Sequence, residues 1–164
     1  DDIRSSLSSS NLTIPNEKKV EEQMITLLKC ITVSVKNKNI EIKTTGLKHL
    51  FGLLIQNGNA FSHNLWNDIF HEIIKPLISS ELYVNKKGVI KDDNVWLLTI
   101  CPKSHHFLVT LFSKYFENIS FLLKDILEDI GGCLLTDNET LANFGISTLS
   151  SLILSNQEGL TTDI

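Results

Sequence analysis

The sequence predicts an all-α fold in which about six helices form hairpins that stack as an α-solenoid of the HEAT or armadillo type. Apolar residues recur at steps of three and four, which is the period of a one-sided helix. Convincing strand alternation is missing from the sequence. The expected hairpin starts are roughly 45 and 58 residues apart, and one long loop accounts for the difference from the ~40–47 residues of such repeats.

The composition is that of a globular chain. It has 164 residues, of which 42% are hydrophobic and 21% charged, with a net charge of −4. A disordered chain has fewer apolar residues and a larger net charge. The sequence pI of about 5.7 argues against a nucleic-acid partner, which needs clustered Lys and Arg in surplus.

The cysteines and the apolar stretches bear on the compartment. Cys30, Cys101 and Cys133 are odd in number and far apart, so we expect reduced thiols in a cytoplasmic protein. No stretch reaches the ~18–20 apolar residues of a membrane span, and the Ser-rich start does not resemble a signal peptide. The first residues suggest a fragment of a longer protein.

Residues 1–15 are expected to be a flexible linker, and residues 16–164 a helical-repeat fragment. The first hairpin is predicted at 16–58. Its helices are separated by the polar break at 36–39, and we expect Gly58 to end the second helix in the left-handed conformation.

The second hairpin is predicted at 61–117. Ser62 is placed as the N-cap of its first helix, and Pro76 is expected to end or kink that helix. A long polar loop at 79–94 follows. Pro102 is predicted to bend or restart the next helix near its first turns.

The third hairpin is predicted at 119–156. Its first helix starts near Ser120 and ends at a Gly-Gly pair. Thr136 and Glu139 match the capping box, in which the two side chains satisfy backbone donors at a helix start.

The sequence contains one candidate cluster for catalysis or metal binding. Cys101 and His105 are four residues apart, which on a helix places a thiol and an imidazole on one face, and His106 is adjacent. A helical metalloenzyme that uses these residues stays an alternative, but no fourth ligand is recognisable and the neighbouring residues are apolar. We expect no catalytic residue, no metal and no cofactor, and therefore no enzyme.

Two groups of lysines form a possible interaction surface, and each is diluted by nearby acidic residues. Trp66 and Trp96 are either partner anchors or core residues, and their helical register favours the core. The lysines are Lys36 and Lys38, with Lys43 and Lys48 beside them, and Lys86, Lys87 and Lys91 in the long loop.

One stretch, TTGLKHLFGLLIQNGNAFSHNLWNDIFHEIIKPLI, and a later one, DNETLANFGISTLSSLILSNQEGLTTDI, carry a family pattern. They resemble the C-terminal helical repeats of the large brefeldin-A-inhibited guanine-nucleotide exchange factors for Arf GTPases. The matching positions that we single out are Gly46, Leu50, Phe51, Gly58, Phe61, Trp66, Phe70, Pro76, Trp96, Leu141 and Gly145.

That resemblance implies a function for the segment. By resemblance, the parent proteins are large and peripheral on Golgi and endosomal membranes. They load GTP on Arf through a separate catalytic domain, and no part of this sequence matches that domain. By resemblance, this segment is a non-catalytic regulatory scaffold that acts through autoinhibition, recruitment or dimerisation. The implied partners are small GTPases of the Arf or Rab type, other domains of the same protein, a second copy and, peripherally, a membrane. The alternative is a HEAT-repeat adaptor of another trafficking protein without an exchange domain.

Overall fold

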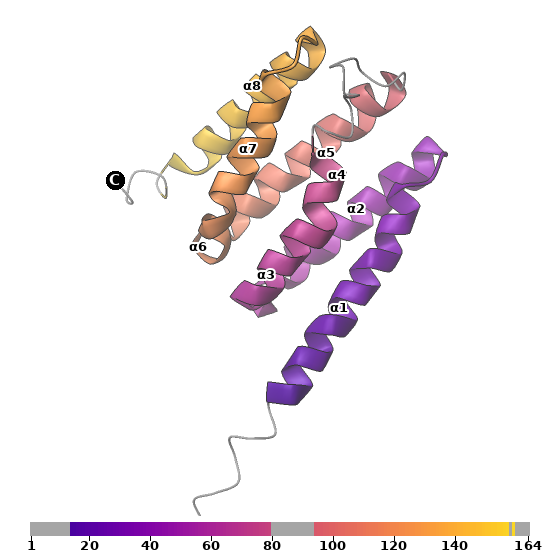
Figure 1. Ribbon diagram of the computed structural model, residues 1–164, viewed down its shortest axis with the longest axis vertical. Helices are drawn as coiled ribbons and strands as arrows, with labels where there is room; N and C mark the ends of the chain where they lie inside the picture. The colour runs from indigo at the N-terminus through magenta and orange to yellow at the C-terminus, as the bar shows by residue number, and fades with distance from the viewer. Residues whose placement is uncertain (1–13, 80–93, 158, 160–164) are drawn as a thin grey trace, which may run out of the picture.

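The computed structural model describes residues 14–79, 94–157 and 159, and every regular element among them is helical. This confirms the predicted all-α class. The helices form two layers that can be followed in Figure 1. The first layer holds α1 (Ile14–Val35), the run α3 (His63–Ile69) to α4 (Lys75–Ile78), α6 (Phe116–Ile119) and α7 (Leu123–Leu134). The second layer holds α2 (Ile40–Asn57), α5 (Asn94–Lys114) and α8 (Glu139–Ser155).

Each second-layer helix packs against a helix of the first layer that precedes it in the chain: α2 on α1, α5 on α4, and α8 on α7. Within the second layer, α5 lies between α2 and α8 (Figure 1). One contiguous apolar cluster runs through all of these pairs, from Leu28 of α1 to Leu152 of α8. The arrangement is that of a short helical solenoid, in which each pair buries its apolar stripe against its neighbour.

The helix starts follow local capping chemistry. Ser62 is the N-cap of α3, because its hydroxyl accepts a hydrogen bond from the Leu65 backbone N–H, and this confirms the prediction. Asn39 caps α2 in the same way, with its side chain accepting from the backbone N–H groups of Glu41 and Ile42. The polar segment 36–39 thus ends one helix and begins the next.

The predicted capping box is wrong. Asn138, not Thr136, is the N-cap of α8, and its side chain accepts from the Leu141 backbone N–H. The Thr136 hydroxyl instead donates to the carbonyl of Cys133 in the last turn of α7. Glu139 is therefore the first helical residue. Its negative charge still stabilises α8, because it lies at the positive end of the helix dipole.

The prediction for Gly58 is also wrong. Its φ of −59° and ψ of −22° are right-handed helical values. A glycine is needed there because a Cβ would lie 2.5 Å from ring atoms of both Trp66 and Tyr115. The glycine is therefore required by the close packing of the Trp66 and Tyr115 rings. It is not required by a left-handed backbone conformation at the end of the helix.

The two prolines behave differently. Ahead of Pro76, residues Phe70–Ile74 form a π-helical turn in which the Lys75 N–H donates to the carbonyl of Phe70. This wider turn accommodates a residue that cannot donate and would crowd the preceding turn, and the helix ends at Ile78, two residues later. Pro102 lies inside α5, which continues through it and does not restart. Ile100 and Cys101 are fully buried beside it, and this burial offsets the cost of the proline, about 3 kcal/mol.

The other differences concern element bounds. α1 begins at Ile14, so the last two residues of the expected linker 1–15 are helical and the rest lie outside the described residues. The expected loop 79–94 also lies outside them, except for its end residues. The helix predicted from Ser120 is preceded by α6 and a 3₁₀ turn, Ser120–Leu122, so that α7 begins at Leu123.

Candidate interaction surfaces

The cluster that sequence reasoning offered for chemistry is a packing feature of α5. The Nδ1 atom of His105 lies 3.0 Å from the carbonyl oxygen of Cys101, to which the ring N–H donates, and 3.8 Å from the Cys101 sulfur. Both residues are buried, and the ring meets Phe144 of α8 edge-on at 4.7 Å. His106 is exposed on another side of the helix. The three side chains do not converge.

Burial fixes the protonation states here. It lowers the pKa of His105 to about 4, against a weaker opposite effect of the hydrogen bond to Cys101, so the ring is neutral at pH 7. Burial, with the negative charge of Asp129, raises the pKa of the Cys133 thiol to about 11. A thiol nucleophile needs an exposed, electropositive setting, and Cys133 has the opposite one.

Metal coordination finds no support among the residues that the structure describes. They contain no group of three His, Cys, Asp or Glu side chains that could hold an ion. A hollow of about 560 Å³ lies between the end of α5 and the end of α8, and its charged lining residues are Lys114 and Glu117. The Lys114 ammonium already donates to the carbonyl of Ile55, so no set of free ionisable groups converges there.

Most residues of the family pattern lie in the core. Two glycines allow helices to approach each other. A Cβ at Gly46 would lie 3.0 Å from the Cβ of Ser34 on α1, and one at Gly145 would lie 3.2 Å from the Cβ of Cys133 on α7. Pro76 is exposed, and the Trp96 side chain lies outside the described part of the structure. The buried members of the pattern are Gly46, Leu50, Phe51, Gly58, Phe61, Trp66, Phe70, Leu141 and Gly145.

Trp66 lies where the two layers meet. It is 1% exposed and packs on Phe61 and Tyr115, with ring centroids 5.1 and 5.5 Å away. The Tyr115 hydroxyl donates to the carbonyl of Ile55 near the end of α2. Trp66 therefore offers no exposed ring to a partner, and its packing connects α3 to the turn that follows α5.

The predicted lysine surface is described only in part. Lys36 and Lys38 are exposed in the turn between α1 and α2. Lys86, Lys87 and Lys91 lie outside the described residues. A joint interaction surface formed by both lysine groups therefore remains a prediction.

Sequence reasoning placed Lys48 only in the first lysine group and missed its association with basic residues of α5, on the outer side of the second layer. Lys48 and His49 of α2 are exposed, and so are Lys103 and His106 of α5. We call these four residues the α2–α5 basic surface. The spacing of Lys103, His106, Thr110 and Lys114 along one face of a helix is the sequence signal that could have shown half of it.

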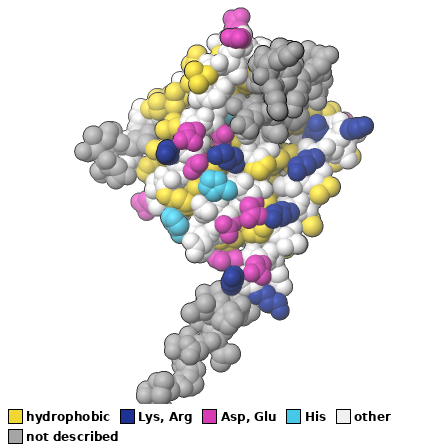
Figure 2. Space-filling model, in the orientation of Figure 1, with side chains coloured by type: hydrophobic (Ala, Val, Ile, Leu, Met, Phe, Trp, Pro, Cys, Tyr) yellow, Lys and Arg dark blue, Asp and Glu magenta, His cyan; other side chains and the backbone are white. Residues whose placement is uncertain are grey.

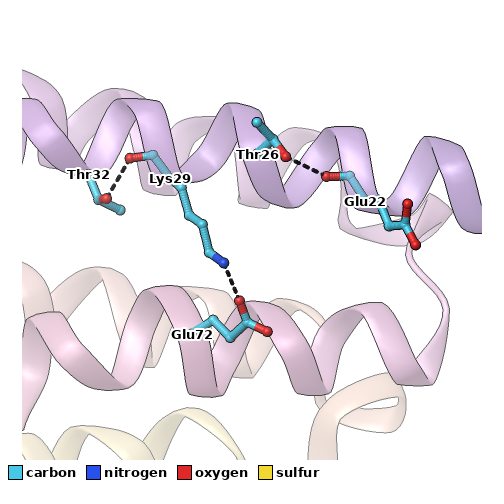
Figure 3. Close-up of polar contacts among 5 residues, drawn as sticks. All are labelled: Glu22, Thr26, Lys29, Thr32 and Glu72. Carbon is cyan, nitrogen blue, oxygen red and sulfur yellow. Dashed lines mark hydrogen bonds and ion pairs between the residues drawn. The ribbon is translucent and has the colours of Figure 1, made fainter.

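The outer side of the first layer is different. Figure 2 shows acidic and basic side chains intermixed on the face toward the viewer. Lys29 of α1 pairs with Glu72 of the π-helical turn, as Figure 3 shows, and Lys75 of α4 pairs with Asp125 of α7 at 3.5 Å. These ion pairs connect successive helices of the layer. Their ammonium and carboxylate groups contact each other and are therefore less available to a binding partner.

No family model and no solved structure matches the chain. Curated proteins do match: they are guanine-nucleotide exchange factors, some named for ADP-ribosylation factor (Arf) and others for their inhibition by brefeldin A. The chain is homologous to a segment of such exchange factors.

Three relatives illustrate the match. The chain is 30% identical over 122 residues to the ADP-ribosylation factor guanine nucleotide-exchange factor SEC7 of Saccharomyces cerevisiae, covering 73% of the chain. It is 26% identical over 138 residues to the human brefeldin A-inhibited guanine nucleotide-exchange protein 1, and 24% identical over 149 residues to sec71 of Schizosaccharomyces pombe, covering 84% and 85% of the chain. The matched stretches are 6–8% of the length of these relatives.

Within the described ranges, no helix is long and apolar enough to cross a bilayer.

Proposed function

We propose that the chain is a non-catalytic regulatory and scaffolding segment of a large Arf guanine-nucleotide exchange factor, from the C-terminal helical-repeat region of that family. The observation that carries the proposal is the match to Arf exchange factors across most of this chain. The residues of the family pattern support it, because those with described side chains are mainly packing residues of a helical stack.

The mechanism that we propose is binding-linked. A rigid stack of helix pairs holds its surfaces in fixed positions relative to the rest of a larger protein. A partner that binds one state of that protein more tightly shifts the equilibrium between a restrained and an active form. The proposed partners are a small GTPase of the Arf or Rab type, another domain of the same protein, or a second copy.

We further propose a cytoplasmic location with peripheral contact to Golgi or endosomal membranes, in vesicle traffic. The names of two relatives support this, because both are exchange factors for ADP-ribosylation factors. The exposed turn that carries Lys36 and Lys38 is the part of the predicted lysine surface that the structure describes. It is the proposed site of a weak, peripheral membrane contact, because each lysine near an anionic leaflet contributes only about 1 kcal/mol.

The regulatory role can be tested by adding the chain to a separately purified Arf exchange domain. Release of a fluorescent GDP analogue from Arf is followed as the chain is titrated. We expect a saturable change in the rate. A rate that stays constant up to high chain concentration would argue against regulation by direct contact with the catalytic domain.

The alternative, a HEAT-repeat adaptor outside any exchange factor, predicts a different result. An adaptor leaves the exchange rate unchanged and binds another protein of the trafficking machinery. The names of the matched relatives favour the exchange factor.

A further inference from the structure

We propose that the α2–α5 basic surface is a docking site for an acidic protein segment, with carboxylates that contact Lys48 and Lys103 together. The inference rests on the proposed function, for which it names one regulatory surface and the chemistry of its partner. Four exposed basic or imidazole side chains from two helices form this surface.

The register of the two helices brings these residues to the same level. The ring of Phe51 on α2 stacks on that of Phe107 on α5, with centroids 5.4 Å apart. Further along, the hydroxyl of Tyr115, next after α5, donates to the carbonyl of Ile55 on α2. Both helices therefore run in the same direction. Lys48, one turn before Phe51, and Lys103, one turn before Phe107, lie side by side across a helix–helix contact of roughly 8–10 Å between axes.

Within the described ranges, no ion pair neutralises the lysines of this surface. The only carboxylates on the described helices α2, α5 and α8 are Glu41 and Glu139, both in the first turn of their helices. The described ion pairs all use first-layer lysines, and neither Lys48 nor Lys103 has a carboxylate partner within the described residues. On the described first-layer helices, acidic side chains outnumber lysines nine to five.

An apolar strip lies beside the lysines. Phe107 is only partly buried, and Gly52, one turn after Lys48, leaves open space where a Cβ would meet no atom within 4 Å. A segment with acidic side chains on one edge and an apolar side chain beside them fits both features. Carboxylates three or four residues apart on a helix are about 5–6 Å apart at Cβ, which suits two neighbouring lysines.

A protein segment fits this surface better than an anionic bilayer. Each lysine close to an anionic leaflet strengthens adsorption only roughly fivefold, so two lysines hold a membrane weakly. A carboxylate that is hydrogen-bonded directly to an ammonium group forms a shorter and stronger contact. Two such contacts with an apolar contact between them give specific binding.

The test uses the 164-residue chain and two fluorescein-labelled helical peptides. One carries Glu pairs four residues apart beside a Leu, and the other has Gln in place of each Glu. Fluorescence anisotropy at low salt should show binding of the Glu peptide alone. The double variant Lys48→Glu, Lys103→Glu should weaken it by about tenfold or more, because two charge-assisted hydrogen bonds are lost.

A matched control separates a local site from overall charge. The variant Lys18→Glu, Lys19→Glu makes the same change in net charge on exposed residues of α1, and it should leave peptide binding unchanged. An equal loss in both variants would overturn the proposal, and so would equal binding of the Gln peptide. Circular dichroism melting checks that both variants fold, and Lys48→Gln, Lys103→Gln gives a milder second test in which binding should also fall.

Two other occupants are distinguished in the same series. Sedimentation with vesicles of phosphatidylcholine and phosphatidylserine that depends on Lys48 and Lys103, without peptide binding, would overturn the proposal in favour of a membrane. Self-association that the same variant abolishes, again without peptide binding, would assign the surface to a second copy. These readouts do not involve nucleotide exchange, so the docking proposal can fail while the proposed exchange-factor role stands.

Discussion

The two layers of this molecule solve the same packing problem in different ways. The first layer is interrupted: a π-helical turn precedes Pro76, and a 3₁₀ turn separates α6 from α7. The second layer consists of three helices of 17 to 21 residues, each continuous. The first layer uses ion pairs between its helices, whereas Lys48 and Lys103 of the second layer have no carboxylate partner among the described residues. The irregular turns are therefore concentrated in the first layer, and the second layer keeps a regular surface.

The largest expected effect comes from breaking the contact between the layers. Trp66→Ala removes a side chain that is 1% exposed and packs on Phe61 and Tyr115. We expect a loss of about 3–5 kcal/mol in the free energy of unfolding, measured by urea denaturation. Leu135→Ala is the control, because Leu135 is 88% exposed. Similar losses in both variants would show that Trp66 does not join the layers.

The second prediction concerns pH and the contact between α5 and α8. The pKa of His105 falls from its usual 6.5 to about 4 on folding, so the unfolded chain binds the proton more readily. Its contribution to stability is complete above pH 6.5 and is lost as the pH falls toward 4, by about 3 kcal/mol in all. Urea denaturation at a series of pH values measures it.

Two variants isolate this effect from the titration of carboxylates. His105→Gln should flatten the pH dependence, whereas His106→Gln, at an exposed position, should leave it as in the parent chain. The account of His105 fails if both variants keep the same dependence.

The third prediction compares glycines. Gly58→Ala should destabilise the chain by about 1–3 kcal/mol, because the new methyl group would lie 2.5 Å from the rings of Trp66 and Tyr115. Gly52→Ala, inside α2 with open space around it, should stabilise the chain by up to about 1 kcal/mol. Thermal melts give both values. A neutral Gly58→Ala would mean that the rings move aside without cost.

The smallest expected effect concerns the first layer. Lys29→Met removes the ion pair with Glu72, in which both side chains are about half exposed. We expect a loss of about 0.2–1 kcal/mol, and less at high salt. A double-mutant cycle with Glu72→Gln measures the pair itself. A coupling energy well above that range would give ion pairs a larger part in holding the first layer together.

The sequence was sufficient for features set by local chemistry. The Ser62 cap, the helix class and the apolar faces around Leu50 and Phe70 follow from spacing and side-chain type. Gly58 and Thr136 show where this reasoning fails. The role of Gly58 is decided by rings from Trp66 and Tyr115, and the cap of α8 by competition between neighbouring polar residues.

The candidate surface was harder to predict than the fold. Lys48 and Lys103 are far apart in the chain, and only the register between α2 and α5 places them together. The sequence predicts His106 only as part of a possible metal site or as a surface residue, and Lys103 belongs to no predicted group. Composition gave a net negative chain, which hides the difference in charge between the two layers.

We propose that this chain acts through contact with partners and does not itself accelerate nucleotide exchange. The most direct measurement is release of a fluorescent GDP analogue from a purified Arf protein with the chain as the only addition. We predict the intrinsic release rate at every chain concentration. Acceleration that rises with chain concentration would contradict the claim.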